Sequence, residues 1–242
     1  MARIRRFVGW VLVLGLLALA GLLAWGHARQ HPQDMPWTAL DLTQPVGAFT
    51  RAKLVRLAED APACRSLLMQ AGVEHDTLPP VQAEGQCGYD QAVRLTGGAA
   101  ELRYRPRPPG TQCAVAAALA LWEWHVVQPA AQRHLGQKVA AVDHLGSYSC
   151  RRLYGREDGD WSQHATANAI DIAGFRLGDG TRITVLGDWD EEGPRGAFLR
   201  EVRDGACDLF ATVLSPDYNA AHRDHFHFDQ AQRGGWGGGV CR

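Results

Sequence analysis

The chain has 242 residues, which is enough for one sizeable domain with its own hydrophobic core. Its formal net charge is −1 and its basic residues are dispersed, so the composition excludes an electrostatic footprint for nucleic acid. With 21% charged and 46% hydrophobic residues, the chain is expected to be folded rather than disordered.

An apolar segment opens the chain and predicts its compartment. Residues 7–25 carry no charge, follow several arginines and are just long enough to cross a bilayer as a helix. Because basic residues hold that end in the cytoplasm, we expect an inner-membrane anchor with the rest of the chain in the periplasm. A cleaved signal peptide is the alternative, with Gly26-His27-Ala28 as its cleavage site, although the run is longer than a usual signal core. We therefore expect residues 1–36 to form a transmembrane anchor, or a signal peptide, followed by a linker. Residues 37–242 are expected to form one domain.

Six cysteines agree with export to an oxidising compartment. Their number is even and none forms a CxxC pair, so disulfides are expected rather than a cysteine zinc site. Six cysteines allow many connectivities, and proximity along the chain is the only guide to the pairing. It favours Cys64–Cys87, Cys113–Cys150 and Cys207–Cys241.

A helix and a hairpin are predicted early in the domain. Asp60 is a suitable N-cap for a helix that Gly72 can end. Residues 89–95 and 100–105 are typical of two short strands, and Gly97-Gly98 between them indicates a hairpin turn.

A long apolar helix is predicted next. Thr111 can cap it, and Pro129 ends or kinks it. Trp122 and Trp124 could form a platform for sugar stacking, but a core and core-edge position in a buried helix is the better interpretation. The apolar residues that repeat at helical spacing are Val115, Leu119, Trp122 and Val126.

Strands and one more helix are predicted in the second half. The strand over residues 168–175 places Ala169 and Asp171 on one face and Ile170 and Ile172 on the other. The order of elements favours an α+β fold, with helices packed on one side of a small antiparallel sheet. The other predicted segments are strands at 139–148, 182–186, 209–214 and 225–228, an amphipathic helix at 196–205, and a glycine-rich loop at 234–239.

Two separate histidine clusters indicate a metal site. One cluster contains His164 and Asp171, and the other contains His225 and His227, which a strand would point to the same face. Histidine and carboxylate are the ligands that Zn²⁺ prefers, and three of them leave a position for water, as in hydrolytic zinc sites. A lone His-x-His is weak evidence, and Asp171 could instead be paired with an arginine. The two clusters together favour zinc.

The residues of these clusters resemble those of a known family. Ser162-x-His164-x-x-Ala167-x-Ala169-x-Asp171 is similar to the SxHxxGxAxD motif of zinc D-alanyl-D-alanine peptidases, which include VanY-type carboxypeptidases, VanX-type dipeptidases and penicillin-insensitive murein endopeptidases. His222-x-x-His225-x-His227 resembles the HxxHxH end of the endopeptidases. More closely, residues from about 60 to 241 resemble the bacterial extensin-like C-terminal domain family.

The resemblance implies a role for each matching residue. His164, Asp171 and His227 would be the zinc ligands, and His225 the further active-site histidine. Arg151 would bind and polarise the substrate, with the adjacent Arg152 as the alternative. Ser162 and His222 match further positions of the motifs and are expected to contribute to substrate binding.

Two departures from the peptidase pattern affect these expectations. The glycine of the motif is Ala167 here, which is a mild change. The glutamate that serves as the base in one branch is replaced by Asp224, so either Asp224 or His225 is the base.

The resemblance implies a zinc-dependent hydrolase of the cell envelope that cleaves peptide bonds in peptidoglycan stem peptides or crosslinks. The bond would be of the D-Ala type, cut as a carboxypeptidase or an endopeptidase. The alternative is a catalytically inactive envelope protein that binds cell-wall peptides or a protein partner. Neither the oligomeric state nor the particular bond follows from the sequence.

Overall fold

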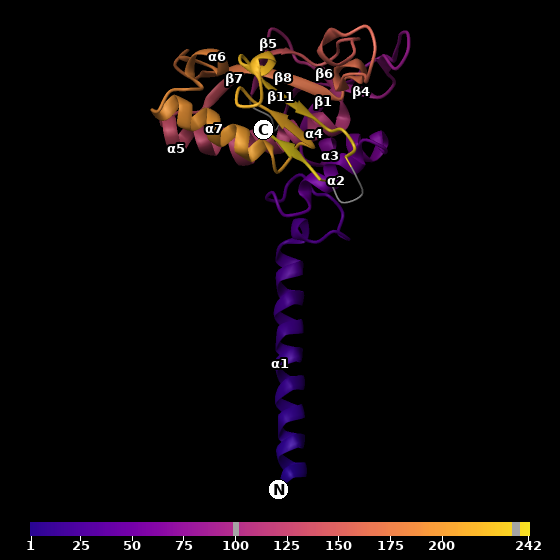
Figure 1. Ribbon diagram of the computed structural model, residues 1–242, viewed down its shortest axis with the longest axis vertical. Helices are drawn as coiled ribbons and strands as arrows, with labels where there is room; N and C mark the ends of the chain where they lie inside the picture. The colour runs from indigo at the N-terminus through magenta and orange to yellow at the C-terminus, as the bar shows by residue number, and fades with distance from the viewer. Residues whose placement is uncertain (99–101, 234–237) are drawn as a thin grey trace.

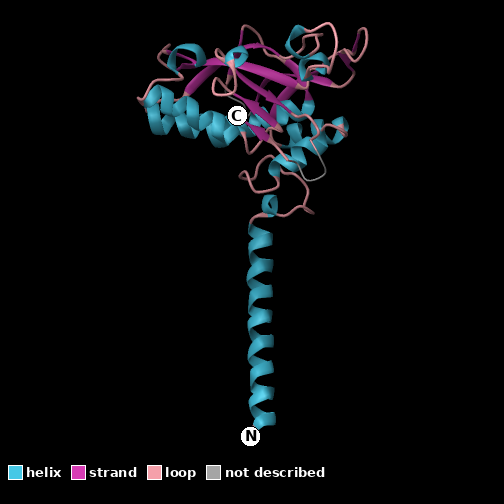
Figure 2. Cartoon of the chain, in the orientation of Figure 1, coloured by secondary structure: helices cyan, strands magenta, loops and turns pink. Residues whose placement is uncertain are grey.

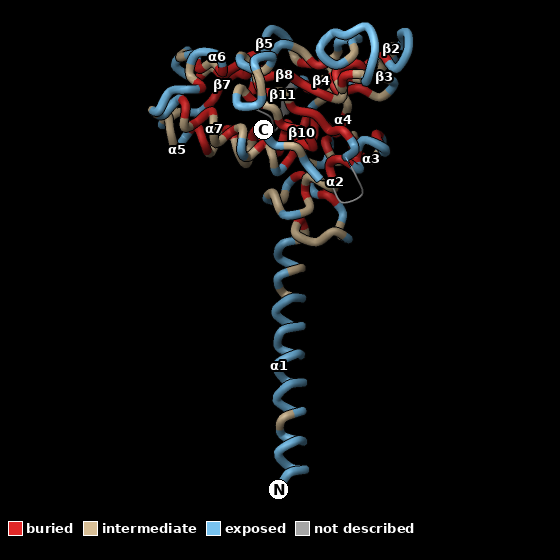
Figure 3. The backbone as a smooth tube through the Cα atoms, viewed as in Figure 1, coloured by how far each residue is buried: buried red, intermediate tan, exposed pale blue. Residues whose placement is uncertain are grey.

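The computed structural model describes residues 1–98, 102–233 and 238–242, and shows an α+β domain on a long N-terminal helix (Figures 1 and 2). This helix, α1 (Ala2–Gln30), is long and apolar enough to cross a membrane, and none of its residues is buried (Figure 3). It contains the whole apolar run expected to serve as anchor or signal.

The segment that follows α1 is fastened to the domain. The helix extends to Gln30, into the expected linker, and a short 3₁₀ turn, η1 (Pro32–Asp34), follows. Lys53 of α2 (Thr50–Leu57) is only 8% exposed. Its ammonium donates to the Pro32 carbonyl at 3.0 Å, to Gln33 Oε1 at 3.0 Å and to Thr38 Oγ1 at 2.8 Å. These contacts hold the segment after α1 against the domain.

A small sheet and helix α3 form the next part of the domain. Helix α3 (Ala61–Gln70) begins as predicted, because Asp60 Oδ1 accepts a hydrogen bond from the Ala63 N–H at 3.0 Å. The sheet has the order β1-β4-β6, and a separate hairpin pairs β2 with β3. The strands are β1 (Val73–Thr77), β2 (Val81–Gln82), β3 (Gly88–Tyr89), β4 (Ala92–Gly98) and β6 (Gly110–Gln112).

The predicted hairpin around Gly97-Gly98 is wrong. Both glycines lie inside β4 and pair with Glu74 and Val73 of β1. Strand β5 (Arg103–Arg105) pairs with a strand of the larger sheet instead, and residues 99–101 lie outside the described residues. Two glycines allow a turn but also fit an extended strand, and long-range pairing with β1 decides between the two.

The central helix is longer than predicted. Helix α4 (Cys113–Trp122) continues through a π-helical turn, η2 (Glu123–Val127), into α5 (Gln128–Leu135). Thr111 does not cap it, because this residue lies in β6 and its hydroxyl donates to the Ala167 carbonyl at 2.9 Å. Pro129 does not end the helix but directly follows the π-helical turn η2, a local departure from regular α-helical hydrogen bonding of the kind that accompanies a proline inside a helix. Trp122 is fully buried, as predicted.

Seven strands of the described residues form the main sheet. Its order is β12-β10-β11-β8-β7-β5, with β9 also paired to β8. The inner pairs are antiparallel, and β5 and β12 join the edges in parallel. The strands are β7 (Val139–Gly146), β8 (Ala169–Leu177), β9 (Arg182–Thr184), β10 (Thr212–Leu214), β11 (Phe226–Asp229) and β12 (Val240–Cys241).

Two further helices and three 3₁₀ turns complete the description. They are α6 (Val185–Asp188), α7 (Pro194–Ala206), η3 (Leu153–Gly155), η4 (Gln163–Thr166) and η5 (Ala220–His222). The strand predicted at 182–186 ends at Thr184, whose hydroxyl accepts from the Gly187 N–H and caps α6. The strand predicted at 209–214 begins only at Thr212.

The core lies between the main sheet and helices α4, α5 and α7. The Trp122 ring lies 5.8 Å from that of Phe175 on β8 and 5.3 Å from that of Phe228 on β11. The Phe198 ring of α7 is 5.0 Å from Phe175. Ile170 is fully buried in this core. Since successive strand residues alternate between faces, the polar neighbours of these residues emerge on the face away from the helices.

All six cysteines, each within the described residues, form disulfides. The predicted pair Cys207–Cys241 is confirmed, but the other two pairings are wrong, because the bonds are Cys64–Cys113 and Cys87–Cys150. The Cys64–Cys113 bond follows from helix packing. Helix α3 lies against α4 and brings Cys64 next to Cys113, the first residue of α4. The distance between cysteines along the chain does not reveal which helices pack together.

Candidate metal centre

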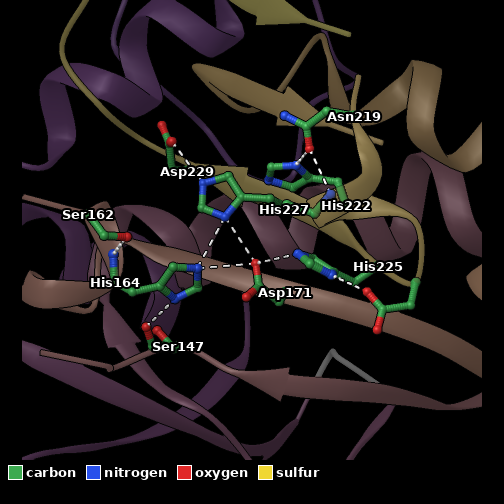
Figure 4. A network of polar contacts seen from close by, with 11 residues as sticks. Ser147, Ser162, His164, Asp171, Asn219, His222, His225, His227 and Asp229 are labelled. Atoms are coloured by element: carbon green, nitrogen blue, oxygen red, sulfur yellow. Dashed lines mark hydrogen bonds and ion pairs between the residues drawn. The ribbon is translucent and has the colours of Figure 1, made fainter. Parts of the chain in front are cut away.

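Three side chains converge on one point of the sheet surface (Figure 4). His164 Nε2 lies 3.1 Å from Asp171 Oδ1 and 3.1 Å from His227 Nδ1, and the last two atoms are 3.0 Å apart. His164 and Asp171 are buried, and the His227 side chain is 12% exposed. The structure thus brings together the residues expected to be the zinc ligands.

A tight turn presents His164. Ser162 precedes it, and the Ser162 hydroxyl accepts a hydrogen bond from the His164 N–H at 3.3 Å. The turn ends at Ala167, which has a left-handed backbone with φ of 56° and is fully buried. Glycine adopts positive φ at low cost, so this backbone conformation is uncommon for an alanine. On its far side, His164 Nδ1 donates to the Ser147 carbonyl at 2.7 Å.

Strand pairing presents the other two residues. Asp171 of β8 and His227 of β11 are direct partners in the antiparallel register, so their side chains leave the same face side by side. The second ring nitrogen of His227, Nε2, donates to Asp229 Oδ2 at 3.1 Å, and Asp229 is 2% exposed. Nδ1 of His227 is therefore left to face Asp171 and His164.

This donor set fits a metal ion. In a tetrahedral zinc site with bonds of about 2.0–2.1 Å, neighbouring ligand atoms lie about 3.3 Å apart, close to the 3.0–3.1 Å seen here. Both histidines donate their outer N–H to an oxygen, to Ser147 and to Asp229, which is the usual arrangement for metal-ligating histidines. His164, Asp171 and His227 could hold the ion.

Hydrogen bonds and charges within the cluster shift the pKa values of its members. Burial opposes ionisation of Asp171, but hydrogen bonds and charges from His164 and His227 outweigh it and place the Asp171 pKa well below its usual range. Burial also opposes a charge on His227, yet its bonds to Asp171 and Asp229 raise the His227 pKa to about 9.

His225 lies beside the cluster with Asp224 behind it. His225 Nε2 lies 3.6 Å from Asp171 Oδ1 (Figure 4). Asp224 Oδ1 accepts a hydrogen bond from His225 Nδ1 at 2.8 Å. The Asp224 side chain is 47% exposed, whereas that of His225 is 13% exposed. Of the two candidate bases, His225 thus has a ring nitrogen, Nε2, directed toward the cluster, and Asp224 fixes the orientation of its ring.

His222 closes one side of the site. Its Nδ1 donates to Asn219 Oδ1 at 2.9 Å, and its ring lies 5.3 Å from His225 and 6.1 Å from His227. Burial, followed by the nearby His225 and His227, lowers the His222 pKa to about 4, and the charge of Arg151 adds to this shift. A neutral His222 has Nε2 available as a hydrogen-bond acceptor at the mouth of the site.

The two candidate arginines differ in their surroundings. Arg152 donates to the Gly159 carbonyl and stacks over the Trp161 ring at 4.4 Å, so its charge is engaged in holding the loop. Arg151 is exposed, and its charge contributes to the lowered pKa of His222. This difference favours Arg151 over Arg152 as the arginine that meets a substrate.

Ser162 lies behind a candidate ligand. The residue is 5% exposed, and its hydroxyl accepts a hydrogen bond from the backbone N–H of His164. Ser162 therefore positions His164, and its role in substrate binding stays a prediction.

Three residues near the site were missed in the sequence. Asp229 was accessible to sequence reasoning, because it extends the alternation of His225 and His227 by one more step on the same strand face. Tyr154 and Asn219 carried no such signal, since they meet only in the fold, where Asn219 Nδ2 donates to Tyr154 Oη at 3.4 Å.

The fold and the site define a class: an α+β domain with a buried histidine–aspartate cluster fit to hold a metal ion on one face of its sheet. The chain belongs to the family described as extensin-like protein C-terminus, whose model matches residues 62–242. This match contains every residue of the cluster. No curated protein and no solved structure matches the chain.

Proposed function

We propose that this chain is a zinc-dependent hydrolase of the cell envelope that cleaves peptide bonds in peptidoglycan stem peptides or crosslinks. The observation that carries the proposal is the convergence of His164 Nε2, Asp171 Oδ1 and His227 Nδ1 within 3.1 Å of one another, with His225 beside them. The similarity of the two motifs to those of zinc D-alanyl-D-alanine peptidases supports the choice of substrate.

The zinc ion and the protein side chains would have different roles in the reaction. Zinc held by His164, Asp171 and His227 would supply Lewis acidity and a water of lowered pKa. The carbonyl of Ser147 and the carboxylate of Asp229 hold the two rings in the orientation that this binding needs.

His225 is the proposed general base. Asp224 accepts the Nδ1 proton of His225, so Nε2 keeps a lone pair that can take a proton from the attacking water. In the protonated state, the same nitrogen can deliver the proton to the leaving amine. Asp224 stabilises the imidazolium through the 2.8 Å contact between the two side chains.

Arg151 is the proposed electrostatic partner of the substrate. Its exposed guanidinium, whose charge contributes to the lowered His222 pKa, can pair with the anionic oxygen that develops during attack or with a terminal carboxylate of the peptide. The neutral His222 ring offers a hydrogen-bond acceptor to the same substrate. D-Ala-type bonds in wall peptides have the carbonyl and carboxylate groups that such a site would recognise.

The proposed location is the periplasm, with α1 in the inner membrane. Three disulfides indicate folding in an oxidising compartment, and α1 has the length and composition of a membrane span.

The test uses the full chain in detergent micelles. Zinc content is measured by elemental analysis, and products formed from muropeptides are identified by mass spectrometry. We expect one zinc per chain and loss of an alanine or opening of a crosslink, whereas Asp171→Ala should lose both zinc and activity. Zinc-loaded protein that leaves all muropeptides intact would support the alternative of a non-catalytic binder of wall peptides.

A further inference from the structure

An arginine-rich patch shares the sheet face of the metal cluster. The arginine face, as we name it, comprises Arg103 and Arg105 on β5, Arg176 on β8 and Arg182 on β9. Strand register sets Arg103 opposite Ala141, Ala141 opposite Arg176, and Arg176 opposite Arg182. A single row across four neighbouring strands thus carries three arginines.

One carboxylate offsets part of this charge. Asp143 lies 3.7 Å from Arg105 Nε, 3.0 Å from Arg176 Nε and 3.1 Å from Arg182 Nε. The Arg103 side chain makes no hydrogen bond or ion pair with another residue of the described part of the chain. Among the described residues of this patch, four guanidinium groups and one carboxylate leave an excess of three positive charges.

Placing two arginines opposite each other on neighbouring strands lowers the stability of the sheet. Arg176 and Arg182 are direct cross-strand partners, and like charges in that position destabilise a sheet. All three contacts to Asp143 are made through Nε, and the terminal N–H groups of these arginines donate no hydrogen bond to a described residue. A planar fork of free N–H groups is the geometry that binds a carboxylate with two hydrogen bonds.

Strand β8 connects the arginine face to the metal cluster. Arg176 follows Asp171 on this strand, and the step from 171 to 176 spans about 16 Å in extended backbone. The neighbours Ile170 and Phe175 both point into the helix-covered core, so Asp171 and Arg176 emerge on the other face. An extended peptide could therefore reach from the cluster to the arginines.

The position relative to α1 argues against the anchoring membrane as the partner. In Figure 1, α1 leaves the domain at the bottom, whereas β5 lies at the top, at the opposite end. Lipid head groups of a bilayer around α1 are therefore remote from the arginine face.

We propose that the arginine face binds carboxylates of an extended acidic peptide whose cleaved bond lies at the metal cluster. This inference rests on the proposed function and adds the substrate class: a peptide with at least two carboxylates away from the scissile bond. Arg176 and Arg182 act as specificity-determining residues, because they hold the peptide at a distance from the reacting atoms.

The test measures binding without hydrolysis. Metal-free full-length protein in detergent micelles is titrated with a fluorescein-labelled penta-D-glutamate peptide and with its penta-D-glutamine counterpart, and anisotropy is recorded at low and high salt. We expect Arg176→Gln/Arg182→Gln to weaken binding of the glutamate peptide by about tenfold. Arg103→Gln, which leaves Asp143 with its partners, should weaken it by about threefold.

A matched control removes the same charge elsewhere. Arg56→Gln/Arg133→Gln changes two exposed arginines on α2 and α5 and should alter binding by less than about twofold, as expected of screened charges. Thermal melts monitored by circular dichroism establish that each variant is folded. The glutamine peptide should bind weakly to every version.

Several outcomes decide the proposal. Folded arginine-face variants that bind the glutamate peptide as tightly as the original chain would overturn it. So would arginine-dependent binding to anionic lipid vesicles without peptide binding, because the face would then be a membrane contact. If peptide binding depends on the arginines but zinc-loaded protein cleaves no muropeptide, the proposed function alone fails. If muropeptides are cleaved and binding ignores the arginines, this inference alone fails.

Discussion

His225 and Asp224 form a pair in which the exposed carboxylate orients the buried ring. Asp224 Oδ1 lies 2.8 Å from His225 Nδ1, and the other nitrogen of the ring lies 3.6 Å from the candidate ligand Asp171. A strand at this position would have turned Asp224 away from His225, but β11 begins only at Phe226. The chain bends just before the strand and places the aspartate behind the histidine.

The first prediction separates the roles of this pair. His225→Ala should lower turnover on a crosslinked muropeptide by at least about 10²-fold, the usual contribution of a general base, while zinc stays bound. Asp224→Ala should have a smaller effect, because it only frees the ring. Turnover and zinc content are measured on the same preparations. A fully active His225→Ala protein beside an inactive, zinc-loaded Asp224→Ala protein would make Asp224 the base.

The second prediction concerns Asp229. Its carboxylate receives Nε2–H of His227 and so fixes Nδ1 as the nitrogen that faces the cluster. Asp229→Asn should reduce zinc affinity by roughly 10- to 100-fold, the usual effect of removing such a partner. Competition with a chromophoric chelator gives the affinity. Asp217→Asn, a change to an aspartate that contacts Trp189 and Arg203 instead, serves as control and should leave zinc affinity unchanged.

The third prediction is a pH dependence of metal binding. Without metal, the His227 pKa is raised from 6.5 to about 9, so this ring holds a proton at neutral pH. Zinc must displace that proton, so zinc affinity should rise about tenfold per pH unit between roughly pH 7 and 9. For the metal-free fold the sign is opposite: the contribution of His227 to stability is complete below pH 6.5 and is lost as pH rises through about 9.

Calorimetry in buffers of different ionisation enthalpy checks this prediction. Each zinc bound at pH 7.5 should release about one proton. Zinc binding without proton release at that pH would show that His227 is neutral in the metal-free protein.

Features that depend on residues close together in the chain were predicted from the sequence. The face of Asp171 and the shared face of His225 and His227 follow from the strand period, whereas the choice of His164, Asp171 and His227 as ligands came from the resemblance of the two motifs. The cap at Asp60 and the burial of Trp122 were predicted for similar reasons, since both depend on residues close in the chain. The α+β class followed from the order of such elements.

Contacts between distant segments could not be predicted in this way. The pairing of Cys64 with Cys113 depends on the packing of α3 against α4, and the pairing of Gly97 with Glu74 depends on β1. The arginine face was missed for the same reason, because Arg103 and Arg176 are distant in sequence and meet only in the register of the sheet.

The last prediction concerns the disulfide nearest the site. Cys87–Cys150 ties the β2–β3 hairpin to the residue before Arg151, so it restrains the segment that presents this arginine. Cys87→Ser/Cys150→Ser should raise KM for a muropeptide several-fold, because Arg151 is less well placed, and should lower the melting temperature.

Cys207→Ser/Cys241→Ser is the matched control, because it frees β12 at the far edge of the sheet from α7. That variant should lose stability to a similar degree, since loops of 63 and 34 residues differ little in closure entropy. Its KM should stay unchanged, and equal KM values in the two variants at a temperature where both are folded would show that the Cys87–Cys150 bond serves stability alone.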